Sequence, residues 1–388
     1  MKIKTILINL SLLVATTAIA LLLGEFVTRL FLNRSDYLGV EMVQDSVLGA
    51  VPSPDAKAGF DAWGFRNREV PKSADIVAVG DSHTFGNTAR MDESWPYVLG
   101  RLTGREVYNM GMGGYGPNQY FYLSNTKALS LHPNMIVWGL YMGDDFQNAY
   151  EITYGLSYWA NLRKLPARNV DADIWDPPAP KPGFVKKCRV WLSEHSVIYQ
   201  VVFHMSPGGR LAGDAQIRDA AQLYPGAATS LSVPDKNILE AFRPKSMLSR
   251  LDQDNLEIQE GMRITFELIQ QMNEICQQHH IRFLVVVIPI KEEVFSDYLE
   301  HNPKLPLNDV IDTLLPNDRL ARQKTFEFLT ESHIAYVDPL PALRASRGNE
   351  LYARSATDMH PSKNGYRVIA EAASEACKRA PEVAQSRH

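Results

Sequence analysis

The chain has 388 residues, of which 45% are hydrophobic, and it carries a formal net charge of −4 with a pI near 6.2. This length and hydrophobic content favour one large α/β domain with an insertion over two independent domains. The slight negative charge leaves no electrostatic footprint for nucleic acid, which argues against such a partner. Three widely separated cysteines allow one disulfide at most and lack the spacing of a metal site: Cys188, Cys276 and Cys377.

The N-terminus carries an apolar segment. Residues 5–23 form an uncharged run of 19 residues behind Lys2 and Lys4, long enough to span a bilayer. A cleaved signal peptide is the alternative, since residues 18–20 (Ala-Ile-Ala) fit the small-x-small cleavage pattern. Because the apolar run continues past that site, we favour an uncleaved transmembrane anchor over residues 1–30.

The orientation of this anchor rests on a small charge difference. Lys2 and Lys4 precede the apolar run, and Arg29 and Arg34 follow it, so the basic residues nearly balance. A long domain behind an N-terminal basic pair makes export the default. We therefore expect a single pass through the inner membrane, with the catalytic domain facing the periplasm or the cell exterior.

Two stretches lie outside the main pattern of the domain, which we expect over residues 60–388. Residues 31–60 have few periodic apolar positions and predict a tether. Residues 150–245 predict an insertion, in which the proline-rich run 175–183 can form neither a helix nor a central strand. Within it, residues 190–203 predict a helix, whereas residues 206–215 and 226–235 are rich in turn-forming residues.

A serine follows the first buried-strand pattern of the domain. Residues 76–79 are apolar, and Gly80, Asp81 and Ser82 come directly after them. Open α/β sheets place their chemistry at the carboxyl ends of the strands, and a strand-to-helix turn there can expose a serine oxygen beside backbone N–H groups. The same tripeptide suits an ordinary turn followed by a helix N-cap. A nucleophilic role for Ser82 therefore requires a base elsewhere in the chain.

A candidate base lies near the C-terminus. Asp358 and His360 precede an apolar helical pattern that includes Val368 and Ile369. A serine nucleophile needs an imidazole within hydrogen-bond reach, and the imidazole needs an acceptor on its other nitrogen. The alternative is a loop at a helix start with a solvated histidine.

Two further loops follow predicted strands, at residues 108–116 and 139–146. The first contains four glycines within six residues, which suits a main-chain donor that approaches an oxyanion closely, or equally a flexible turn. The second contains Asp144 and Asp145.

With these segments in this order, the chain resembles the GDSL, or SGNH, hydrolases. The resemblance covers roughly residues 60–150 and 245–385. It implies that Ser82 is the nucleophile and a backbone oxyanion donor, that Gly114 supplies the second backbone donor, and that His360 is the base. It further implies that Asp358 orients His360, that the fold is a three-layer α/β/α sandwich around a mostly parallel sheet, and that no metal or organic cofactor is required.

Two departures from the family pattern stand out. Where the family usually has Gly-x-Asn-Asp, with the asparagine amide as an oxyanion donor, this chain has Asp144 before Asp145. An ionised carboxylate cannot donate, so Asp144 is protonated, or another group donates, or the site only binds. The acid and base are spaced Asp-x-His rather than the commoner Asp-x-x-His, which resembles the membrane-associated acyltransferase branch that includes alginate acetylation proteins.

The resemblance implies a serine-dependent esterase or acyl (acetyl) transferase. The expected partner is an O-acylated carbohydrate, such as an acetylated cell-surface or exported polysaccharide. The alternatives are a non-catalytic glycan-binding or scaffold protein with a degraded site, and a thioesterase or lipase at the membrane surface. Aromatic residues of the insertion suit either sugar stacking or core packing: Tyr154, Tyr158, Trp159, Trp175 and Trp191.

The pattern from residue 255 onward predicts the rest of the sheet. A helical pattern is followed by a strand at 283–288 that is apolar on both faces, typical of a central parallel strand, and the last strand is expected at 334–337. Lys291 lies after the first of these strands and can approach the site, although a solvated first helical turn is the favoured interpretation. His279 and His280 are interpreted as a helix terminus and not as a metal site.

Overall fold

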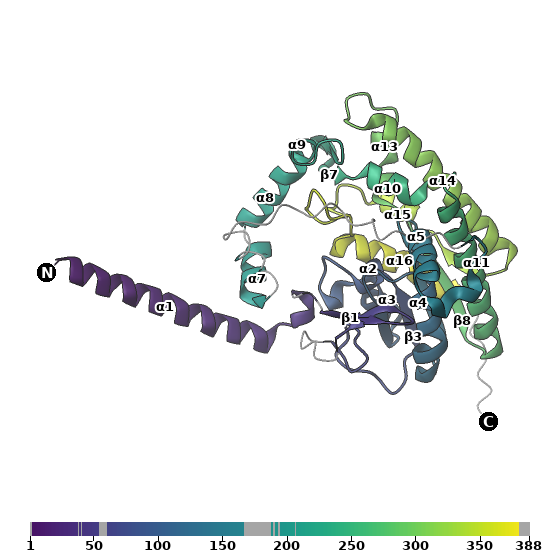
Figure 1. The fold of residues 1–388 in the computed structure, drawn as a ribbon, viewed down its shortest axis with the longest axis horizontal. Coiled ribbons are helices and arrows are strands. Elements are labelled where there is room, and N and C mark those ends of the chain that lie inside the picture. The colour runs from purple at the N-terminus through teal and green to yellow at the C-terminus, as the bar shows by residue number, and fades with distance from the viewer. Residues whose placement is uncertain are drawn as a thin grey trace.

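The structure is a computed structural model that describes residues 2–37, 39, 41–53, 60–166, 188, 191, 192, 195–205 and 207–379. A single helix, α1 (Lys2–Phe31), extends away from the rest of the molecule (Figure 1). The segment Lys4–Phe31 is long and apolar enough to cross a membrane, with a mean hydropathy of 2.4 over its best window. This agrees with a membrane anchor or a signal sequence at the N-terminus.

The body is built on a five-stranded parallel sheet with strand order β4-β3-β5-β8-β9. The middle strands are buried along their whole length because their sequences are apolar on both faces, as parallel sheets between helices require. Both strands predicted after residue 255 are confirmed. The strands are β3 (Ile76–Gly80), β4 (Val107–Gly111), β5 (Met135–Tyr141), β8 (Arg282–Ile288) and β9 (Ala335–Val337).

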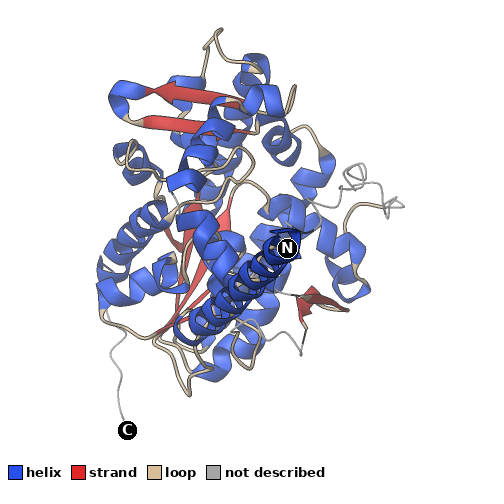
Figure 2. Cartoon of the chain, turned by 90° about the vertical axis from the view of Figure 1, so that its left-hand side faces the viewer, coloured by secondary structure: helices blue, strands red, loops and turns tan. Residues whose placement is uncertain are grey.

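Helices cover both faces of this sheet (Figure 2). On one side α3 (Trp95–Thr103) packs with α16 (Lys363–Arg379), and on the other α11 (Leu256–Gln278) packs with α4 (Pro117–Leu123) and α5 (Asp145–Gly155). The predicted three-layer α/β/α sandwich is therefore confirmed. Asn255 caps α11 by accepting a hydrogen bond from the Glu257 backbone N–H at 2.9 Å, which explains where the helical pattern begins.

The order of the strands reverses next to β3. The chain passes from β3 to β4 on one side and then returns to β5 on the other side of β3. Loops that leave neighbouring strands in opposite directions open a crevice at the carboxyl end of the sheet, where α/β proteins bind their ligands. Ser82 and the two loops singled out in the sequence follow these three strands.

Two antiparallel hairpins lie outside the main sheet. The first, β1 (Met42–Asp45) with β2 (Gly49–Pro52), lies in the predicted tether. The second, β6 (Thr229–Val233) with β7 (Ile238–Phe242), lies in the insertion. The turn-rich interpretation of 226–235 was wrong over β6, because pairing with β7 satisfies the backbone of this polar segment.

The turn-rich interpretation of 206–215 was also wrong, because α8 (Pro207–Arg218) spans most of that segment. Its glycines disfavour a helix, but Gly213 packs directly against the backbone oxygen of Arg354 and a larger residue would clash there. Tertiary contact thus outweighs the low helix propensity. The proline-rich run 175–183 lies outside the described residues.

The remaining elements are mostly short. The π-helical segment is Ser124–Ala128, and the 3₁₀ segments are Arg34–Asp36, Met91–Glu93, Leu129–Leu131, Ser157–Leu162 and Pro234–Lys236. The other helices are α2 (Ser82–Phe85), α7 (Val197–Met205), α9 (Ala220–Leu223), α10 (Pro244–Leu251), α12 (Lys291–Val294), α13 (Ser296–Leu299), α14 (Asn308–Glu331) and α15 (Leu340–Ala345).

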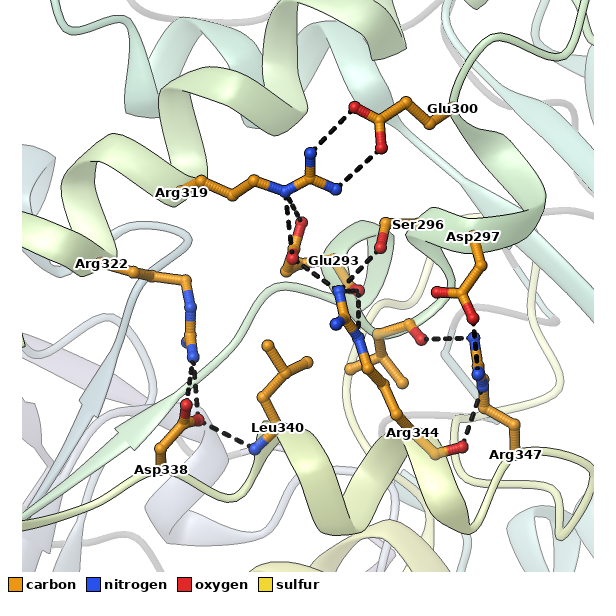
Figure 3. A network of polar contacts seen from close by, with 11 residues as sticks. Glu293, Ser296, Asp297, Glu300, Arg319, Arg322, Asp338, Leu340, Arg344 and Arg347 are labelled. Carbon is orange, nitrogen blue, oxygen red and sulfur yellow. Dashed lines mark hydrogen bonds and ion pairs between the residues drawn. The ribbon is translucent and has the colours of Figure 1, made fainter.

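An ion-pair network joins the helices that follow β8 and β9 (Figure 3). The carboxylate of Glu293 in α12 accepts from Arg344 in α15 at 2.6 Å and lies 3.3 Å from Arg319 in α14. Arg322 of α14 binds Asp338, directly after β9, with both contacts at 2.8 Å. Because Glu293 is buried, Arg344 and Arg319 compensate a negative charge that water does not reach. The network fixes the segments that leave the last two strands.

Candidate active site

The nucleophile candidate sits at the start of α2. Asp81 is the N-cap of this helix, and its Oδ1 accepts a hydrogen bond from the His83 backbone N–H at 2.8 Å. Ser82 is therefore the first helical residue, where backbone N–H groups have no partner within the helix. The turn therefore both caps a helix and presents the Ser82 hydroxyl.

A row of glycines lets α2 lie close to the strand ends. Gly80 pairs in register with Gly111 on one side and Gly139 on the other. A Cβ atom on Gly111 would lie 2.2 Å from the Phe85 backbone nitrogen, and one on Gly139 would lie 2.3 Å from Thr84 Oγ1. Any side chain in this row would push α2, and Ser82 with it, away from the sheet.

The structure brings the predicted serine, histidine and aspartate together. Oγ of Ser82 lies 2.7 Å from Nε2 of His360, and Nδ1 of His360 lies 2.7 Å from Oδ1 of Asp358. The same Asp358 oxygen accepts the His360 backbone N–H at 3.0 Å. One carboxylate thus orients both the ring and the main chain of His360, which explains how an Asp-x-His spacing can serve the purpose.

The loop that carries His360 is held by backbone contacts. Ala353 N–H donates to the His360 carbonyl at 3.0 Å, and Tyr352 forms a β-bridge with Pro361. Thr88 Oγ1 donates to the Pro361 carbonyl at 2.7 Å, which ties this loop to the segment after α2. These contacts fix the position of His360 relative to Ser82.

The charges around His360 favour its protonated form. Burial lowers the pKa of His360, but the hydrogen bond to Asp358 and the negative charges of Asp358, Asp81 and Asp144 outweigh it, so the pKa lies above 6.5. Burial raises the pKa of Asp358, but its contacts with His360 outweigh this and hold that pKa below the ordinary value. The pair is arranged to stabilise an imidazolium.

A second histidine borders the site, and sequence reasoning did not single it out. Nδ1 of His83 lies 2.9 Å from Oδ2 of Asp81, its ring stacks on Tyr141 at 3.7 Å between centroids, and it lies 4.8 Å from the His360 ring. Burial lowers the pKa of His83 despite the nearby Asp81. Its position directly after Ser82 was the signal available in the sequence.

Asp81, Asp144 and Asp145 form an acidic cluster beside Ser82, with ligand oxygens within 4.8 Å of one another. Asp145 is fully buried and accepts hydrogen bonds from Tyr120 Oη at 2.8 Å and from the Tyr141 N–H at 2.9 Å. Burial, together with the neighbouring Asp81 and Asp144, raises the pKa of Asp145. Asp145 is therefore part of the structural support of the site.

Asp144 is the member of this cluster that faces open space. Its side chain is 24% exposed, and Oδ2 lies 3.6 Å from Nη1 of Arg250. Among the described residues Oδ1 has no hydrogen-bond partner. Burial and the charge of Asp81 raise the pKa of Asp144 to about 7, against the opposing effect of Arg250. Near pH 7 the Asp144 carboxyl group is therefore neutral in a large fraction of the molecules.

The glycine-rich loop after β4 lies beside Ser82. A Cβ atom on Gly113 would lie 3.9 Å from the Ser82 Cβ, and Gly114 has φ of 78° with no atom near its own Cβ position. Asn109 ties this loop to α2, since it donates to the Thr84 carbonyl at 2.9 Å and accepts from the Gly111 N–H at 2.8 Å. Gly114 follows Gly113 directly in the chain and is exposed.

The insertion attaches to the carboxyl end of β8 through a buried ion pair. Nζ of Lys291 lies 2.7 Å from Oε2 of Glu240 in β7, and both side chains are buried. The backbone N–H of Arg243 donates to Glu292 at 3.2 Å. The solvated interpretation of Lys291 was therefore wrong, because the hairpin β6–β7 covers the helix start that the sequence left open.

The aromatic residues of the insertion divide into two groups. Tyr154 and Trp159 are buried, and Trp159 Nε1 donates to the Val47 carbonyl at 2.8 Å, so these two serve packing. Tyr158 and Trp191 are exposed. Trp175 lies outside the described residues.

Comparison with known proteins matches the chain only to solved structures, since no family model and no curated protein matches it. A member of the lipolytic G-D-S-L family from Veillonella parvula is 12% identical, with 79% of this chain and 98% of that chain covered and a TM-score of 0.35. An extracellular lipase from Streptomyces rimosus is 10% identical, with 80% and 100% covered and a TM-score of 0.41.

An acetylxylan esterase from Geobacillus stearothermophilus is 12% identical, with 79% of this chain and 95% of that chain covered and a TM-score of 0.35. The chain has a three-layer α/β/α fold built on a five-stranded parallel sheet. Because these identities and TM-scores are low, what the site can do chemically depends on its own residues.

Proposed function

We propose that the chain is a serine-dependent ester hydrolase or acyl transferase. The observation that supports this is the continuous set of short contacts from Asp358 through His360 to Ser82, each at 2.7 Å. A serine hydroxyl needs a positioned base, and the base needs an acceptor for its second nitrogen. All three sit at the carboxyl end of the sheet.

In the proposed reaction Ser82 Oγ attacks the ester carbonyl while His360 Nε2 takes the hydroxyl proton. Asp358 accepts a hydrogen bond from Nδ1–H and stabilises the imidazolium. The backbone N–H groups of Ser82 and Gly114 donate hydrogen bonds to the tetrahedral oxyanion. Collapse expels the alcohol, which takes the proton from His360, and leaves an acyl-serine.

The second half of the reaction repeats these roles with a new nucleophile. Water or a sugar hydroxyl gives its proton to His360 and attacks the acyl group, and Ser82 leaves with that proton. Water yields a hydrolase, and a sugar hydroxyl yields a transferase. In both cases His360 accepts and returns every proton that is transferred.

We propose that Asp144 donates the third hydrogen bond to the oxyanion in its neutral form. Its pKa of about 7 leaves it largely protonated below neutral pH, and its unpaired Oδ1 is free to accept or donate among the described residues. A carboxylic acid kept neutral by burial can act as an oxyanion donor. Arg250, 3.6 Å away, limits how far the pKa of Asp144 rises.

The substrate we propose is a short acyl ester, such as acetyl, on a cell-surface or exported polysaccharide. Its support is the resemblance of the Asp-x-His spacing to membrane-associated acyltransferases and an N-terminal helix long enough to anchor the domain at a membrane. We further propose that this helix is a single-pass anchor in the inner membrane, with the domain in the periplasm or outside the cell.

The test is acetate release from 4-nitrophenyl acetate and from an acetylated glycan by the full chain in detergent, beside Ser82→Ala. We expect activity that falls by more than about 10³-fold in the variant. Adding an acceptor glycan then separates hydrolysis from transfer, and acyl-chain-length preference separates a carbohydrate enzyme from a lipase.

A non-catalytic glycan-binding or scaffold role is the second candidate, and Asp144 in place of asparagine is the observation that favours it. A fluorophosphonate probe decides between the two. Stoichiometric labelling at Ser82 supports the enzyme, whereas a folded protein that neither labels nor releases acetate supports the binding role.

A further inference from the structure

The short helix α7 is fastened to the end of α1. The carboxylate of Glu25 accepts hydrogen bonds from the backbone N–H groups of Val197 and Ile198, both at 3.0 Å, and from Ser196 Oγ at 2.8 Å. These are the first N–H groups of α7, which a carboxylate satisfies while it complements the helix dipole. Arg29 donates to the His195 carbonyl at 2.6 Å.

Close packing accompanies these polar contacts. A Cβ atom on Gly24 would lie 2.6 Å from Cδ1 of Ile198, so glycine is what allows the two helices to approach here. Figure 1 shows α7 beside the C-terminal part of α1, with α8 continuing from it toward the body. The contact therefore lies where α1 leaves its uncharged run.

The position of this contact along α1 corresponds to a membrane surface. The uncharged run ends at Leu23, and Glu25 and Arg29 are the first charged residues beyond it. A hydrocarbon core about 30 Å thick is crossed by about 20 residues, so a helix inserted through residues 5–23 places Glu25 at the boundary. The start of α7 then lies at the same depth.

Large apolar side chains are exposed in and beside α7. Seven of its nine residues are apolar, the exceptions being Gln200 and His204. Val202 is 61% exposed, and two residues that flank the helix in sequence are exposed to a similar degree, Trp191 at 58% and Leu211 at 68%. Large exposed apolar side chains, tryptophan among them, are typical of helices that lie in the headgroup region of a bilayer.

We propose that α7 lies in the membrane interface beside α1, with the bilayer surface covering Val202, Trp191 and Leu211. This rests on the proposed anchoring of the chain by α1. The occupant is a lipid surface because α7 is bound to a helix long enough to cross a membrane, at the point where that helix becomes charged.

The next helix carries this contact to the active site. In α8, Asp214 pairs with Arg354 and Arg210 pairs with Glu350. The neighbouring Ala353 N–H donates to the His360 carbonyl at 3.0 Å. The interfacial helix is thus joined through α8 to the loop that holds the base, so membrane contact fixes the orientation of the site relative to the bilayer.

The experiment uses the full chain in vesicles of phosphatidylethanolamine and phosphatidylglycerol. The exposed Cys188 is first removed by Cys188→Ser. Val202→Cys then provides the attachment site for an environment-sensitive fluorophore. The matched control is Leu320→Cys, at an exposed apolar position on α14. Quenching by spin-labelled lipid is compared with quenching by aqueous iodide, and extraction with alkaline carbonate reports whether α1 is inserted.

We expect a chain that resists carbonate and a probe at position 202 that lipid quenches at least about twofold more than the probe at position 320. Glu25→Ala should lower that lipid quenching while the chain stays inserted. A probe quenched by iodide as strongly as the control, in a chain that resists carbonate, overturns the interfacial role of α7 and leaves the anchor standing. Release of the chain by carbonate overturns both, and neither result alters acetate release by Ser82.

Discussion

Nε2 of His360 lies 2.7 Å from Oγ of Ser82, although 278 positions separate the two residues in the chain. The serine stands at the end of β3, and the histidine comes from the loop before α16. The two residues meet at the carboxyl end of the parallel sheet. Asp358, two positions before His360 in the chain, contacts Nδ1 of its ring.

Asp358→Asn should lower kcat/KM for 4-nitrophenyl acetate by about 10²–10⁴-fold with no change in fold, because an amide can hold the wrong tautomer of His360. Steady-state kinetics and circular dichroism measure the two effects. Asp309→Asn, an exposed acid on α14, is the matched control and should leave the rate unchanged. An Asp358 variant as active as the control would remove this residue from the mechanism.

The proposed donor role of Asp144 predicts a narrow pH–rate profile. His360 must be neutral to act as the base, and its raised pKa moves the acidic limb above pH 6.5. Asp144 must be neutral to donate, and its pKa of about 7 makes activity fall as the pH rises through that value. We expect kcat/KM measured between pH 5 and 9 to pass through a maximum near neutral pH.

Asp144→Asn should abolish the alkaline limb, because an amide donates at every pH. The acidic limb should move to lower pH, since the negative charge of Asp144 is one of the causes that raise the pKa of His360. We expect a gain of about tenfold or more in kcat/KM at pH 8.5, where the wild-type carboxylate repels the oxyanion. Loss of activity in this variant would show that the carboxyl group itself is required.

Gly111→Ala should destabilise the protein by about 1–3 kcal/mol or more, because the new methyl would lie 2.2 Å from the Phe85 backbone nitrogen and the backbone must move. Thermal unfolding measures the change. Gly155→Ala is the control, as nothing lies within 4 Å of that Cβ position and alanine favours a helix. Equal melting temperatures for the two variants would contradict close packing of α2 on the glycine row.

Lys291→Ala should cost about 3–5 kcal/mol, because it leaves the buried Glu240 carboxylate without its cation. The double variant Lys291→Met with Glu240→Leu removes both charges and should recover most of that loss. Chemical denaturation of the wild type, Lys291→Met, Glu240→Leu and the double variant measures the coupling. Additive losses in the double variant would show that the two charges do not stabilise each other.

Much of the site was accessible from local sequence. The apolar run at 76–79 predicts β3 because a strand buried on both faces must be apolar throughout. Ser82 follows this run, and Asp358 and His360 precede an apolar helical pattern. The tripeptide at Ser82 alone could not separate a nucleophile from a helix cap, and the structure shows that Asp81 does cap α2 while Ser82 faces His360.

Three features needed the tertiary structure. The raised pKa of Asp144 depends on its burial beside Asp81, which lies 63 positions earlier in the sequence. The burial of Lys291 depends on Glu240 in a hairpin that the sequence did not predict. The helix α8 depends on the Arg354 backbone that packs against Gly213.

By itself, the sequence determined the strand pattern, the long apolar N-terminal helix and the identity of the groups able to act as nucleophile, base and acid. These follow from hydrophobic periodicity and from residue chemistry, both of which are local. Only the tertiary structure decided the raised pKa of Asp144, the burial of Lys291 and the docking of α7 on Glu25. Each of these depends on desolvation or on partners distant in the chain, and the energy of a charge is set by what surrounds it in space.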